Sequence, residues 1–170
     1  SFSENNEVMP SKDDKKRFDI TVKNAQLFID EVKKKNYSFT PIASIQGWNP
    51  ASMAKMAKIF TKMGYQYLAI GGLVPLNVKQ IHSAVSAVRE SAPDCDLHLL
   101  GFTKDSNIHE FFQYRITSFD STSPLIRAFK DNSRNYWTDN YKYSAIRIPQ
   151  WGSNKKLKRR ILAGQIDQEV

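Results

Sequence analysis

The chain of 170 residues is 41% hydrophobic, and 25 lysines and arginines against 17 aspartates and glutamates give it a net charge of +8. No apolar run reaches the roughly 20 residues of a membrane span, so no membrane partner is expected. The basic balance favours a polyanionic partner such as nucleic acid. A lone cysteine, Cys95, excludes an internal disulfide and a thiolate metal cage, and it predicts a reducing, cytoplasmic setting.

The predicted elements alternate between helix and strand along the chain. Residues 1–16 are polar and charged and are expected to form a surface loop or a flexible end. Apolar residues that recur every three or four positions predict helices at 17–36, 50–63, 78–92 and 105–114. Short apolar segments between them predict strands at 42–46, 67–70, 97–101 and 116–120. This order is typical of successive βα units in an α/β fold with a parallel sheet.

The last part of the chain is polar, aromatic and basic. A helix is expected over residues 154–170, and its first turns carry five positive charges, on Lys155, Lys156, Lys158, Arg159 and Arg160. Such a run is most often a solvated helix face, but it also suits contact with a phosphate backbone. Trp48, just after the first predicted strand, suits stacking on a nucleobase, although packing is the commoner role of an aromatic side chain.

Polar residues and glycines stand where the predicted strands end. Gln46 closes the first strand, Gly71 and Gly72 follow the second, Gly101 closes the third, and Asp120 closes the fourth. The carboxyl ends of parallel strands share one edge, and ligands bind at that edge in α/β folds. The sequence therefore predicts that these groups meet at one rim.

Each of these residues has two interpretations. Asp120 suits a catalytic carboxylate, and equally an N-cap or Asx turn that introduces the following serines. Gln46 offers a donor and an acceptor to a planar ligand, whereas on its own it is more typical of a loop residue that satisfies backbone groups. The Gly71-Gly72 pair gives a ligand access to bare backbone, but most such pairs are plain turns.

Several kinds of site are not indicated. His82, His98 and His109 lack metal-ligand spacing and are interpreted as structural, so no metal is expected. The glycine patterns of dinucleotide sites and phosphate-binding loops are missing, and so is a serine, histidine and aspartate arrangement. The sequence thus predicts neither a cofactor nor a hydrolase.

Taken together, the strand ends resemble the ordered motifs of the tRNA-guanine transglycosylase superfamily. These motifs are Ser44-Ile45-Gln46-Gly47, Ile70-Gly71-Gly72-Leu73, Leu100-Gly101 and Ser118-Phe119-Asp120-Ser121. The continuation through Pro124 and Leu125 to Arg127 resembles the branch that modifies DNA more closely than the tRNA enzymes. The zinc site of the tRNA enzymes has no counterpart here, which also favours the DNA branch.

The resemblance implies a function and roles for individual residues. Proteins of this family are (β/α)₈ TIM barrels that exchange a guanine in nucleic acid for a free 7-deazaguanine base, of the preQ0 type in the DNA branch. Asp120 is similar to the nucleophile that attacks C1′ of the target nucleotide, which must be extruded from its stack. Gln46 would read the purine edge, and the backbone of Gly71, Gly72 and Leu73 would bind the base. Arg127 is a weaker candidate for contact with nucleic acid.

The resemblance also implies that residues 17–153 form only about four βα units, the second half of a barrel. The upstream half, with a second catalytic aspartate, has no counterpart, and the chain begins with serine rather than methionine, as a fragment would. The other half is expected from the same polypeptide, a second chain or another copy in a homo-oligomer. Two alternatives stay open: a tRNA-guanine transglycosylase of the archaeosine or queuosine type, and a non-catalytic nucleic-acid-binding α/β module.

Overall fold

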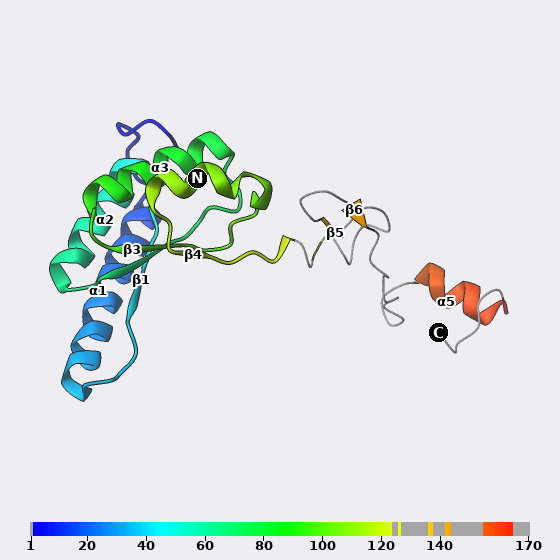
Figure 1. Ribbon diagram of the computed structural model, residues 1–170, viewed down its shortest axis with the longest axis horizontal. Coiled ribbons are helices and arrows are strands. Elements are labelled where there is room, and N and C mark those ends of the chain that lie inside the picture. The colour runs from blue at the N-terminus through cyan, green and yellow to red at the C-terminus, as the bar shows by residue number, and fades with distance from the viewer. Residues whose placement is uncertain (1, 124–125, 127–135, 138–141, 144–154, 165–170) are drawn as a thin grey trace. The chain divides into compact units, whose positions relative to one another are not determined.

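The computed structural model describes residues 2–123, 126, 136–137, 142–143 and 155–164 (Figure 1). The chain divides into two compact units, Ser1–Ser121 and Thr122–Val170.

The first unit alternates helices with parallel strands. Its elements are α1 (Lys12–Lys35), β1 (Ile42–Ile45), α2 (Pro50–Met63), β2 (Tyr67–Ile70), α3 (Val78–Ser91), β3 (Asp96–Leu99), the 3₁₀ helix η1 (Asp105–Tyr114) and β4 (Ser118–Phe119). The four strands are hydrogen-bonded in the order β1-β2-β3-β4, and every pair is parallel. The predicted α/β class is therefore confirmed.

Side-chain caps decide where the helices begin. Asn49 and Asn77 cap α2 and α3, as their positions before the apolar stripes predict, and each accepts a hydrogen bond from the backbone N–H three residues on. α1 begins at Lys12, earlier than the apolar stripe from residue 17 predicts. The reason is a capping box: Ser11 and Asp14 bind each other's backbone N–H, which stabilises a first turn that carries no apolar residue.

The two faces of the sheet differ. Ile45, Leu68 and Leu97 lie on one face and are fully buried in the core that includes side chains of α2 and α3. Alternate residues point to the opposite face, where the register places Ser44, Ala69, His98 and Ser118 side by side. Three of these four residues are polar, so we call this side of the sheet the polar face. It extends to the strand ends.

The second unit contains a short antiparallel pair and the basic helix. β5 (Tyr136–Trp137) pairs with β6 (Lys142–Tyr143), which the sequence did not predict. The basic helix α5 spans Lys155–Leu162, and Gly164 follows it with φ of 67°. The predicted continuation over residues 165–170 lies outside the described residues. Within the described parts, no helix is both long and apolar enough to cross a membrane.

Candidate active site

The hydrogen-bonded rows of the sheet continue one residue past the strands. The N–H of Gly71 donates to Ile45 O at 2.9 Å, and the N–H of Leu100 donates to Ile70 O at 2.9 Å. The N–H of Asp120 donates to Leu99 O at 3.2 Å, and the carbonyl of Asp120 accepts from Phe102 N–H at 2.8 Å. Asp120 therefore holds a fixed place in the sheet, at the same level as Gln46 and Gly71.

The carboxylate of Asp120 has two unequal oxygens. Oδ1 accepts hydrogen bonds from Gly101 N–H at 2.9 Å and from His98 Nε2 at 3.0 Å. Oδ2 accepts none from the residues that the structure describes. The Gly101 N–H, and then His98, lower the pKa of Asp120 below its ordinary value. The site thus presents an ionised carboxylate, about half exposed, with one oxygen held and the other open to a reactant.

His98 does more than the sequence indicates. Its Nδ1 lies 2.7 Å from Ser118 Oγ, and Ser118 in turn forms a short hydrogen bond with the hydroxyl of Tyr67. A polar chain thus runs across three strands to Asp120. Two observations together would have revealed this contact. Ser118 and Asp120 are two residues apart and so point to the same face, and the register of β3 with β4 places His98 opposite Ser118 on that face.

A cavity of about 310 Å³ opens beside the ends of β1 and β2. Gln46, Trp48 and Gly72, three of the residues that the sequence proposes for a ligand site, line it. The N-terminal part of α1 contributes Asp14, from the predicted polar end, and Arg17 and Thr21, from the predicted helix over residues 17–36; the sequence placed none of them at a site. The ring of Trp48 also packs against Phe18, with ring centroids 5.8 Å apart.

One glycine beside this cavity leaves its backbone accessible. Gly72 has φ of 75°, and a Cβ at this position would meet no heavy atom within 4 Å. The backbone of Gly72 thus faces open space, and only glycine adopts this conformation without strain. Leu73 is buried in the core with its backbone, and Gly71 is buried too, with its N–H bonded to Ile45 O, so of the three predicted base-binding residues only Gly72 is exposed.

Comparison with known proteins bears on this site. No protein-family model matches the chain. Over 158 residues, or 92% of its length, the chain is 38% identical to the DNA-guanine transglycosylase of Salmonella montevideo. The resemblance to the DNA-guanine transglycosylase branch is confirmed. The chain spans 38% of the length of that relative.

The match to the DNA-guanine transglycosylase includes the whole rim. Only about a dozen residues of the chain lie outside it, so the segment from Gln46 to Asp120 falls within the matched region. The likeness also extends to most of the second unit, where Lys155, Lys156, Arg159 and Arg160 are exposed on α5. Lys158 belongs to the same helix, and Arg127 lies outside the described residues.

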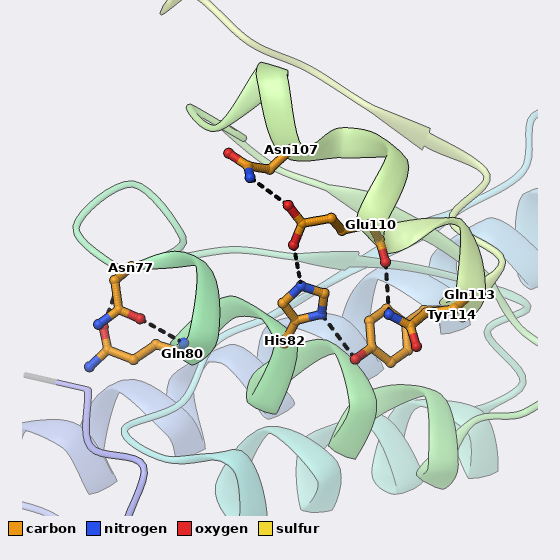
Figure 2. A network of polar contacts seen from close by, with 7 residues as sticks. All are labelled: Asn77, Gln80, His82, Asn107, Glu110, Gln113 and Tyr114. Carbon is orange, nitrogen blue, oxygen red and sulfur yellow. Dashed lines mark hydrogen bonds and ion pairs between the residues drawn. The ribbon is translucent and has the colours of Figure 1, made fainter.

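A second polar cluster joins α3 to η1 (Figure 2). His82 Nδ1 lies 3.0 Å from the hydroxyl of Tyr114, and His82 Nε2 lies 3.2 Å from Glu110 Oε2. Asn107 donates to the other carboxylate oxygen of Glu110, and the imidazole stacks on Phe111 with centroids 4.2 Å apart. These contacts within the unit fit the structural role that the sequence suggests for His82. Within the described ranges, no three His, Cys, Asp or Glu side chains form a group that could hold a metal ion.

The Glu110 carboxylate gives this cluster a pH dependence. Hydrogen bonds from Asn107 and then His82 lower the pKa of Glu110, so the contribution of its ionised form to stability is complete above the ordinary glutamate pKa. That contribution is lost as the pH falls through the lowered pKa. We expect Glu110→Gln to lower the melting temperature at neutral pH, and the gap to wild type to shrink between about pH 5 and 3. An equally wide gap at all pH values would contradict this, and Glu7→Gln, at an exposed position, is the control.

Proposed function

We propose that this chain is the nucleophile-bearing and base-recognising part of a DNA-guanine transglycosylase, a pentosyltransferase that replaces guanine in DNA by a 7-deazaguanine base of the preQ0 type. The observation that carries the proposal is the carboxylate of Asp120, ionised, held through Oδ1 and open at Oδ2, at the rim where parallel strands end. The similarity to the Salmonella montevideo protein supports the reaction class.

The proposed chemistry consists of two displacements at one carbon. Oδ2 of Asp120 forms a bond to C1′ of an extruded nucleotide while the C1′–N9 bond breaks, and its electron pair goes to guanine, which takes up a proton. The incoming base then loses the proton of its corresponding ring nitrogen and attacks C1′. The ester C–O bond breaks and returns the electron pair to the carboxylate. Two inversions retain the configuration at C1′, as in a retaining glycosidase.

The cavity at the ends of β1 and β2 is the proposed base site, and Asp120, at the end of β4, is not among its lining residues. Its volume of about 310 Å³ is within the range of small-molecule pockets. The amide of Gln46 offers a donor and an acceptor to the edge of a purine, and the open backbone of Gly72 offers further hydrogen-bonding groups, whereas Gly71 and Leu73 are buried. Trp48 would stack on a base, and the exposed cations of α5 would contact the phosphate backbone of DNA.

We further propose that the sheet is half of a TIM barrel. Parallel sheets are almost always covered on both faces, whereas the polar face here carries Ser44, His98 and Ser118, none of them fully buried. The edge strands expose Ile42 and Phe119, at 45% and 43%. Strands from the same polypeptide, from a second chain or from another copy would pair with these edges and close the barrel. The proposed setting is the cytoplasm, where DNA and free base are both present.

Mass analysis of nucleosides tests the function. Host DNA and tRNA are digested with the gene present and with the gene deleted. We expect a 7-deazaguanine deoxynucleoside in DNA that disappears on deletion, with tRNA unchanged. Loss of a modified nucleoside from tRNA alone would assign the protein to the tRNA branch, and no change in either polymer would favour a non-catalytic binding module.

A further inference from the structure

The surroundings of His98 are unusual for a histidine inside a strand. The flanking residues Leu97 and Leu99 point into the core and are fully buried. The His98 side chain points to the polar face, where it is 19% exposed, and both of its ring nitrogens have partners. A histidine that only filled space would not need two polar partners on the neighbouring strand, one of them the candidate nucleophile.

The hydrogen-bond chain can be satisfied from end to end with a neutral His98. An ionised Asp120 can only accept, so Nε2 of His98 is the donor to Oδ1. In neutral imidazole the other nitrogen is then an acceptor, and Nδ1 accepts from the hydroxyl of Ser118. The oxygen of Ser118 accepts from the hydroxyl of Tyr67. The hydroxyls of Tyr67 and Ser118 thus each donate one hydrogen bond toward His98. With a neutral His98, every contact from Tyr67 to Asp120 then has one donor and one acceptor.

We propose that His98 is the positioning residue for Asp120, an inference that rests on the proposed function. With Gly101 N–H it occupies Oδ1, which fixes the rotamer of a half-exposed carboxylate and directs Oδ2 toward the reactant. In the covalent intermediate Oδ1 becomes the carbonyl oxygen of the ester. When the second displacement restores the carboxylate, negative charge returns to an oxygen that already has two donors, as at an oxyanion hole.

Few other ionisable groups of the described residues act on His98 and Asp120. Tyr67 faces His98 from β2 through Ser118, and Asp120 faces it from the end of β4. Asp96 lies two residues earlier on β3, and its carboxylate accepts a hydrogen bond from the Thr117 hydroxyl. The pKa of Asp120 is therefore expected to depend on the hydrogen bonds from Gly101 N–H and His98 rather than on a distant charge.

Three variants test the proposal in the protein as expressed from its own gene. His98→Phe keeps a planar ring without a donor, His98→Gln keeps an N–H at about the reach of Nε2, and His109→Phe is an exposed control. The ¹³C resonance of the Asp120 carboxyl carbon is followed with pH, and the rate of covalent adduct formation with guanine-containing DNA is measured across the same range.

We expect His98→Phe to raise the pKa of Asp120, to move the acid limb of the rate profile to higher pH and to slow adduct formation by about 10²-fold at neutral pH. His98→Gln should restore most of the rate and the lower pKa, and His109→Phe should change neither. A His98→Phe protein with an unchanged titration and rate would overturn the positioning role. If the wild-type protein forms no adduct while the titration still depends on His98, the proposed function fails and the contact between His98 and Asp120 stands.

Discussion

Asp120→Asn is expected to abolish the covalent adduct between the protein and guanine-containing DNA, with base exchange reduced by about 10⁴-fold or more. Asparagine has nearly the shape of aspartate, and its carbonyl oxygen can still accept from Gly101 N–H and His98. What it lacks is the negative charge and the nucleophilic oxygen at the position of Oδ2. DNA binding, measured by fluorescence anisotropy at fixed salt, should therefore stay within a few-fold of wild type.

The control for this variant is Asp19→Asn, a similar change at an exposed position on α1. It should leave adduct formation, exchange and binding unchanged. An undiminished adduct in Asp120→Asn would show that another group attacks C1′. Equal loss of binding and exchange would instead point to a misfolded rim, which a thermal melt of the same preparation would reveal.

Arg89→Met is expected to lower the free energy of unfolding by about 2–4 kcal/mol. The guanidinium of Arg89 lies at the end of α3 and binds five backbone carbonyls. Nε donates to Tyr114 O at 2.8 Å, Nη1 donates to three carbonyls in residues 92–95 at 2.8–3.2 Å, and Nη2 donates to Arg115 O at 3.1 Å. A methionine fills similar space but leaves these carbonyls without their donor, so the loops that lead into β3 and β4 lose a common anchor.

Two further variants separate this role from simple charge. Arg89→Lys should recover less than half of the loss, because an ammonium group cannot reach both sides as the planar guanidinium does. Arg115→Gln removes one side-chain bond, to Pro93 O, and should cost about 1 kcal/mol or less. Denaturant unfolding gives all three values. Equal stability of Arg89→Met and wild type would mean that water replaces the guanidinium at these carbonyls.

Much of the fold was predictable because local signals and tertiary structure agree. The apolar stripes and the asparagine caps of α2 and α3 all mark elements that the structure contains. The start of α1 was missed because its first turn is held by Ser11 and Asp14 and not by apolar packing. The pair β5 and β6 was missed because each strand is two residues long, too short for a period to show.

The site was predictable only in part, for a related reason. Residues that end strands, such as Gln46 and Asp120, are visible in the sequence because the apolar run stops there. His98 lies inside a strand, and its contact with Asp120 depends on the register of β3 with β4, which no local pattern specifies. Arg17 reaches the cavity only because α1 runs beside the first strand ends, and Arg89 acts through carbonyls up to 26 residues away.

Backbone hydrogen bonds continue the sheet past β4, so the register of β4 decides to which face the Asp120 side chain points. Its N–H is paired with Leu99 O at the end of β3 and its carbonyl with Phe102 N–H just after β3, so Asp120 and Ser118 share the polar face. A shift of β4 by one residue would turn the carboxylate toward the helices and bring a phenylalanine, Phe119, into its place. Insertions and deletions between η1 and β4 would thus be selected against by chemistry rather than by folding, and the length of that connection should be among the least variable features of related chains.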